Sequence, residues 1–117
     1  MLKKKFRVIG NSMSPVIKPG DFIQFDQIDT IENLKVFDIV IFNQNGELIC
    51  HYFWRKNQYF TEDKDEIVIT RPLNPLTAYD HPIKGSDILG KVKYYKIGLY
   101  HKILIFFHNF LNKMKYE

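Results

Sequence analysis

The sequence predicts a mainly β fold that is followed by a C-terminal amphipathic helix. Three observations support this prediction. Ten Phe and seven Tyr occur among 117 residues, and aromatic side chains suit the half-buried faces of sheets. Runs rich in β-branched and aromatic residues alternate with Gly, Pro, Asn and Asp turn signals up to about residue 95. After residue 98, apolar side chains recur instead with the spacing of a helix.

The first part of the chain, residues 1–97, is expected to form one β domain, because it contains no repeat and no linker. Strands are expected at residues 5–10, 21–26, 36–42, 47–55, 59–61, 67–70 and 88–95. Asn45-Gly46 is a strong hairpin signal, because both residues tolerate positive φ. Turns are expected at 56–58 and 62–66. Residues 71–86 should be irregular, since two prolines interrupt their start.

The second part, residues 98–117, should be an amphipathic helix. Its apolar positions are Leu99, Ile103, Phe106, Phe107, Phe110, Leu111 and Met114. The stretch 103–112 carries no charge but is far too short to span a bilayer of about 30 Å. Two interpretations stay open. The helix packs on the β domain or a partner, or it lies in a membrane interface with its lysines toward the head groups.

Composition narrows the partners and the compartment. The net charge of +4 is spread along the chain, and there is no basic recognition helix or C-x-x-C spacing, so no nucleic acid partner is expected. Cysteine and histidine never show the spacing of a zinc half-site, so we expect no metal and no other cofactor. A lone Cys50 and the lack of a signal peptide predict a cytoplasmic protein, either soluble or peripheral at a membrane.

Ser12 is the first candidate for chemistry. It lies in Gly10-Asn11-Ser12-Met13-Ser14-Pro15, where an expected strand ends in a proline-punctuated turn. A hydroxyl at such a junction is exposed and fixed, which suits a nucleophile. Taken alone, such a residue is far more often an ordinary turn serine.

His51 is the best candidate for the base that a serine nucleophile needs. It lies in the middle of the expected strand 47–55. Because side chains alternate along a strand, His51 points away from the face of Cys50 and Tyr52. A dyad between Cys50 and His51 is therefore excluded.

At this point the chain resembles a known family. The matching blocks, in order, are Gly10-x-Ser12-Met13-x-Pro15, Gly20-Asp21, the strand around Asp38, a basic strand residue, and Leu89-Gly90-Lys91-Val92. They resemble the S24/S26-type serine peptidases, which include the signal peptidases and LexA/UmuD-like proteins, and they cover most of residues 6–95. The resemblance implies a compact LexA/signal-peptidase-like β-fold and a serine nucleophile with a single basic partner.

The residue that serves as the base distinguishes the branches of this group. The bacterial signal peptidase and LexA branches use lysine, whereas the endoplasmic reticulum signal peptidase branch uses histidine. His51 falls at that place, so the chain looks closest to the Ser-His branch. Nearby Arg55 cannot serve, since a guanidinium does not deprotonate in proteins.

Two family blocks are altered. Thr70-Arg71-Pro72-Leu73-Asn74-Pro75 replaces the usual Thr-Lys-Gly-Asp-Asn and resembles the Pro-x-Asn-Pro block of the LexA-like branch. An acid that orients His51 would then come from Asp80 or, as the weaker alternative, Asp63. The second Gly-Asp pair of the family is Phe37-Asp38 here.

The resemblance implies a small serine endopeptidase that cleaves a leader or signal-like peptide by acyl transfer. The Ser12 N–H would serve as an oxyanion donor, and Gly10 provides no side-chain donor. An extended substrate would lie beside residues 6–10. The substrate-binding residues are expected to be Phe6, Val8, Ile9, Gly10 and Met13. The alternative is a catalytically inactive peptide-binding module of the same fold.

Overall fold

The computed structural model describes residues 3–60 and 66–116. Within these ranges the chain forms seven strands, one 3-10 helix and one α-helix. They are β1 (Lys3–Arg7), β2 (Phe22–Gln27), β3 (Ile39–Gln44), β4 (Glu47–Phe60), β5 (Glu66–Arg71), β6 (Ile83–Lys84), η1 (Gly85–Asp87), β7 (Ile88–Val92) and α1 (Leu99–Tyr116). The prediction of a mainly β fold with a C-terminal helix is confirmed.

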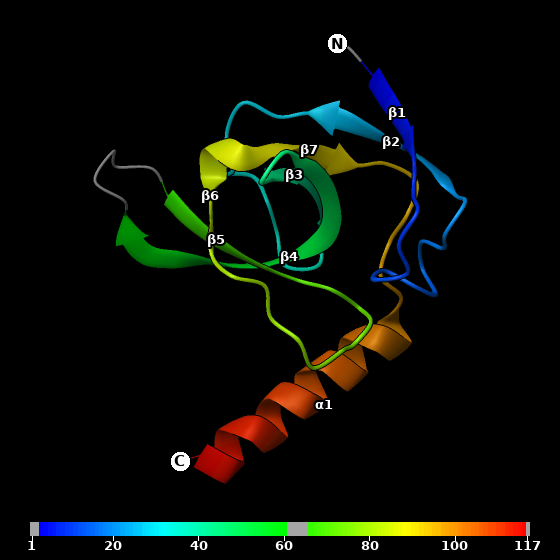
Figure 1. Cartoon of the computed structure of the whole chain (residues 1–117). Helices are drawn as coiled ribbons and strands as arrows, with labels where there is room; N and C mark the ends of the chain where they lie inside the picture. Colours follow the sequence, from blue (N-terminus) through cyan, green and yellow to red (C-terminus); the bar gives the residue numbers. More distant parts are fainter. Residues whose placement is uncertain (1–2, 61–65, 117) are drawn as a thin grey trace.

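The described strands form one antiparallel sheet in the order β1-β2-β7-β3-β4-β5-β6. The last strand in the chain, β7, therefore lies inside the sheet and pairs with β2 on one side and β3 on the other. Figure 1 shows the sheet curling, with β2 and β7 on one side of the molecule, β4 and β5 on the other, and α1 beyond them.

Strand β3 separates two hydrophobic clusters, because its side chains alternate between the two faces of the sheet. Ile39 and Ile41 belong to one cluster, and Val40 and Phe42 to the other. The burial of both faces explains why this strand is a continuous apolar run. The first cluster also takes in Met13, Ile17, Ile23, Phe25, Phe37, Tyr52, Leu73, Val92, Ile97 and Ile105.

The two Gly-Asp-like blocks form the same turn. In each, the aspartate N–H donates to the lysine carbonyl at 3.0 Å, and the lysine N–H donates to the aspartate carboxylate at 2.9 Å; the pairs are Lys18 with Asp21 and Lys35 with Asp38. The residue before each aspartate has positive φ, +94° at Gly20 and +76° at Phe37. Phe37 thus adopts a backbone that favours glycine. This turn delays the third strand, expected from residue 36, until residue 39.

The hairpin between β3 and β4 is turned by Asn45 (φ +54°) and Gly46 (φ +86°), as their sequence predicts. The prediction of a turn at residues 56–58 is wrong, because β4 continues to Phe60. There Lys56 and Asn57 pair with β5, and register shifts on either side accommodate the irregularity. Pairing with a distant strand overrides the local turn preference. Thr61 and residues 62–65, which completed the expected strand and turn, lie outside the described residues.

Other boundaries differ by a few residues. β1 lies at 3–7 instead of 5–10, and β7 ends at Val92 instead of residue 95. The expected irregular stretch 71–86 contains the short strand β6 and part of η1. Gly90 in β7 is enclosed so closely that an added Cβ would lie 2.3 Å from the Phe25 ring and 2.5 Å from the Asp26 carbonyl oxygen. The family-like Leu-Gly-Lys-Val block thus contains a glycine that sheet packing requires.

Helix α1 is attached to the domain near its middle. Ile105 is fully buried, and the Phe106 ring packs edge-on against Phe37 with centroids 5.4 Å apart. The Tyr79 hydroxyl donates to Asn109 Oδ1 at 3.1 Å. No helix within residues 3–60 and 66–116 has the length and apolar character needed to cross a membrane.

Candidate active site

Ser12 lies in a compact turn that follows β1. The Ser14 N–H donates to the Asn11 carbonyl at 3.0 Å, and the Ile17 N–H donates to the Met13 carbonyl at 2.9 Å. Met13 and Ile17 are 2% and 0% exposed, so their side chains anchor the turn in the first hydrophobic cluster. The Ser12 side chain itself is half-buried. The sequence therefore fixes the serine by burying the apolar residues of its own turn.

The Ser12 backbone connects this turn to the loop after β5. Its carbonyl accepts the N–H groups of Leu73 at 2.8 Å and of Asn74 at 2.9 Å. Asn74 also donates through its side chain to the Asn11 carbonyl at 3.4 Å. Among the backbone bonds of the described residues, the Ser12 N–H has no acceptor. This N–H is thus available beside the hydroxyl.

His51 projects from β4, opposite Val40 of β3. Its Nε2 lies 3.1 Å from Ser12 Oγ, within hydrogen-bond distance. The ring stands edge-on to Phe42 with centroids 5.9 Å apart, which restricts its orientation. The strand alternation anticipated from the sequence thus directs His51 toward Ser12.

Asp80 lies on the other side of the imidazole. Its Oδ2 is 2.5 Å from His51 Nδ1 and accepts the Thr70 hydroxyl at 2.6 Å. The Asp80 N–H donates to the Thr70 carbonyl at 3.0 Å, which fixes the backbone of the acid. A carboxylate at Nδ1 assigns the proton to that nitrogen and leaves the Nε2 lone pair for the Ser12 hydroxyl. The structure thus brings Ser12, His51 and Asp80 together, while their catalytic roles stay predictions.

Arg71 holds the loop that carries Asp80, a role that the sequence did not reveal. Its side chain is fully buried, with the guanidinium carbon 4.5 Å from the Trp54 ring centroid and 4.2 Å from that of Tyr79. Nη2 donates to the Leu76 carbonyl at 3.0 Å and Nε to the Ala78 carbonyl at 3.3 Å. Stacking and hydrogen bonding by one cation thus shape the chain just before Asp80.

A groove of about 380 Å³ opens beside Ser12 and His51. One wall is formed by residues 7–10 and the other by the hairpin residues 44 and 47–51. Four of the expected substrate-binding residues line it: Val8, Ile9, Gly10 and Met13. Ile9 is 90% exposed, whereas Met13 forms the buried floor. The side chain of Phe6 lies outside the described part of the structure, as does Asp63, the weaker candidate for the acid.

Cys50 also lines the groove, but its thiol is not suited to act as a nucleophile. Burial raises its pKa from 9.0 to about 12. The thiol therefore stays protonated near neutral pH, and only the thiolate is a good nucleophile. Of the two candidate nucleophiles in the groove, Ser12 has the base within reach.

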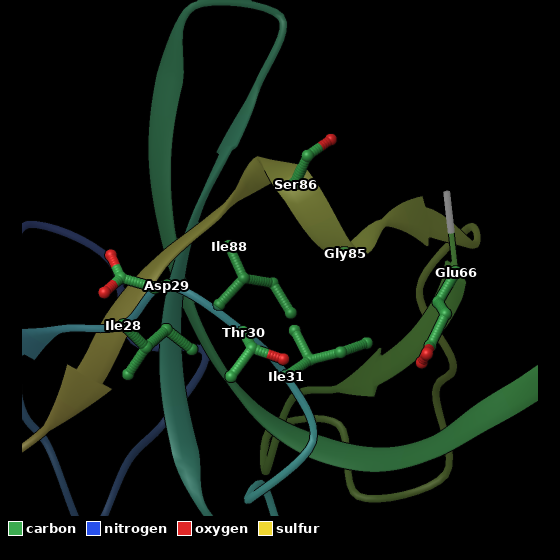
Figure 2. Close-up of a pocket in the computed structure, with 8 residues that line it drawn as sticks. All are labelled: Ile28, Asp29, Thr30, Ile31, Glu66, Gly85, Ser86 and Ile88. Carbon is green, nitrogen blue, oxygen red and sulfur yellow. The ribbon is translucent and has the colours of Figure 1, made fainter. Parts of the chain in front are cut away.

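A second pocket, of about 450 Å³, lies between residues 28–31 after β2 and residues 85, 86 and 88. Figure 2 shows Ile31 and Ile88 close together there, with Glu66 at one side and Asp29 at the other. None of Ser12, His51 and Asp80 lines this pocket. Within the described ranges, no group of three or more His, Cys, Asp or Glu side chains is placed to hold a metal ion. The arrangement suited to chemistry is therefore the groove beside Ser12.

The site combines a curled antiparallel sheet with a serine and a histidine at hydrogen-bond distance beside a groove. A comparison with family models defines the class of protein, because the model described as Peptidase S24-like matches residues 5–92. The chain belongs to the Peptidase S24-like family. No curated protein matches the chain significantly.

Proposed function

We propose that the chain is a serine endopeptidase that cleaves a leader or signal-like peptide segment by acyl transfer. Ser12 is the nucleophile, His51 the general base and Asp80 the acid that orients the histidine. The observation that carries the proposal is the continuous series of hydrogen bonds from Asp80 through His51 to Ser12, at 2.5 and 3.1 Å. Membership of a peptidase family is consistent with it.

In the first half of the reaction, Ser12 Oγ attacks the carbonyl carbon of the scissile peptide while its proton passes to His51 Nε2. The carbonyl oxygen becomes an oxyanion, which the free Ser12 N–H stabilises. Asp80 stabilises the imidazolium that has formed. Nε2 then protonates the leaving amine nitrogen, the C–N bond breaks, and an acyl ester remains on Ser12. Water, deprotonated by His51, hydrolyses this ester and restores the serine hydroxyl.

The groove suits an extended peptide. β1 is an edge strand of the described sheet, and Val8 uses both its N–H and its carbonyl on the β2 side, with Asp21 and Gly20. Because backbone groups alternate in direction along an extended chain, those of Arg7 and Ile9 face the other way, toward the groove. A substrate strand can pair there, with its side chains between residues 7–10 and the β3–β4 hairpin. The apolar lining by Val8, Ile9 and Met13 next to Ser12 favours an uncharged side chain beside the cut bond.

The test is cleavage of a library of proteome-derived peptides, with new termini identified by mass spectrometry. The wild type should generate a defined set of termini, and Ser12→Ala and His51→Ala should generate none of them. Ser14→Ala, which alters a second serine of the same turn, is the matched control and should cleave normally.

Termini that persist in Ser12→Ala would disprove the proposal. Peptides that the wild type retains without cleaving them would disprove it in favour of the inactive peptide-binding module. Circular dichroism of each variant shows whether the loss of cleavage reflects chemistry or unfolding.

A further inference from the structure

Helix α1 turns most of its apolar side chains away from the β domain. Seven of the described apolar side chains of α1 are exposed, and we call them the outer face: Leu99, Tyr100, Ile103, Phe106, Phe107, Phe110 and Leu111. Leu99 is 73% exposed, Phe107 59% and Phe110 58%. The fully buried Ile105 lies nearly opposite the outer face, since successive helical residues are about 100° apart. Contiguous exposed apolar patches of this kind mark interaction surfaces.

The side of α1 that faces the domain is the more polar one. Asn109 accepts a hydrogen bond from Tyr79, and the Lys102 ammonium lies 5.4 Å from the Phe37 ring centroid. Phe106, at the margin of the outer face, also packs on Trp54. These contacts hold the helix in an orientation in which its apolar face points away from the core of the described domain.

The segment that carries the outer face, together with the strand before it, is basic. Residues 88–116 contain six lysines and no aspartate or glutamate. A pocket of about 600 Å³ next to the start of α1 is lined by Lys35, Lys91, Lys93, Lys96 and Lys102, together with Asp26 and Asp38. The two aspartates pair with Lys93 at 3.6 Å and with Lys91 at 3.5 Å, so the three other lysines leave the pocket positively charged.

We propose that the outer face of α1 lies in the head-group region of an anionic lipid bilayer. Apolar side chains flanked by lysines suit this position, since the rings enter the acyl boundary while the ammonium groups reach the phosphates. A second copy fits less well. Pairing two outer faces would bring two lysine-rich segments together, because residues 88–116 contain six lysines and no acid. Aspartates from elsewhere in the described residues pair with only two of these lysines, Lys91 and Lys93. This inference does not depend on the proposed peptidase activity.

The experiment measures the binding of the full chain to vesicles by flotation. Vesicles of phosphatidylglycerol and phosphatidylcholine are compared with vesicles of phosphatidylcholine alone. Wild type should bind the anionic vesicles at least about tenfold more strongly than the neutral ones. Phe107→Ser combined with Phe110→Ser should weaken binding about 100-fold, at about tenfold per ring. Phe22→Ser in β2, where the ring is also 58% exposed, should change it less than about twofold.

Absence of binding to anionic vesicles, or equal binding by the double variant, would overturn the proposal. Equal binding to the neutral vesicles would also overturn it, because the bilayer would then not be recognised by its charge. Sedimentation equilibrium tests the alternative that a second copy of the chain binds the outer face. A wild-type dimer that the double variant abolishes, without any vesicle binding, would assign the outer face to a second copy. Matching thermal melts show that the altered side chains affect only the surface.

Discussion

Replacing Arg71 by methionine should destabilise the protein. The change does remove a costly buried charge, because no carboxylate of the described residues pairs with Arg71. Methionine has a similar length and keeps the space filled. It cannot donate to the carbonyls of Leu76 and Ala78, which the arginine now bonds at 3.0 and 3.3 Å. It also loses the cation–π contacts of the guanidinium with Trp54 and Tyr79.

The expected magnitude follows from these contacts. A hydrogen bond from a charged group contributes about 1.5–3 kcal/mol, and each cation–π contact adds about 0.5–2 kcal/mol. Against this stands the cost of burying the charge, several kcal/mol, which methionine avoids. Two carbonyls also lose their donors, so we expect the lost interactions to outweigh the avoided cost of burying the charge. The free energy of unfolding should decrease by about 2–4 kcal/mol.

The assay is urea unfolding followed by the fluorescence of Trp54, the single tryptophan, which lies against Arg71. The control is Arg55→Met, an exposed arginine of the same sheet, which should shift the free energy by less than about 0.5 kcal/mol. If Arg71→Met is as stable as the wild type or more stable, the buried cation does not hold the loop. The account of how Asp80 is positioned would then be refuted.

Three further predictions test the site and the sheet. Asp80→Asn should lower the rate of Ser12 acylation by about 10³–10⁴-fold, because the amide no longer fixes the histidine tautomer; a loss below about tenfold in stopped assays would contradict the assigned role. Gly90→Ala should cost at least about 2 kcal/mol in urea unfolding, since backbone blocks the new Cβ, whereas Gly98→Ala, with open space around it, should stay within about 0.5 kcal/mol. Cys50 should react with iodoacetamide at pH 8 at least about 100-fold more slowly when folded than in urea, as its raised pKa implies; equal rates would refute the burial argument. The stability that the protonated thiol contributes is intact below pH 9.0 and should be lost as the pH rises toward about 12.

Local patterns were sufficient to anticipate the elements that bring the site together. Turn chemistry placed Ser12 after the first strand, and the alternation along β4 separated His51 from Cys50. The Asn45-Gly46 hairpin fixed the register that brings His51 beside β3. Asp80 was named as an acid only because the usual family block at 70–75 is altered. The geometry now joins it to His51.

What the sequence did not reveal depends on partners far apart in the chain. The turn expected at 56–58 disappears because β5 pairs there, and that pairing is not encoded within the turn. Arg71 and Thr70 acquire their roles from Trp54, Tyr79 and Asp80, which come from other segments. For α1, periodicity identified the apolar face correctly but cannot say which face meets the domain. The contacts around Ile105 decide that.

The most direct measurement of the central claim is covalent labelling of Ser12 by a serine-directed phosphonofluoridate. The reagent needs no known substrate, because it reports only whether the hydroxyl is activated by a base. The account predicts one adduct, located on Ser12 by peptide mass spectrometry, with a labelling rate that falls at least about 100-fold in His51→Ala. Ser14→Ala should label as the wild type does. A folded protein that shows no adduct on Ser12, or one labelled equally fast without His51, would contradict the account.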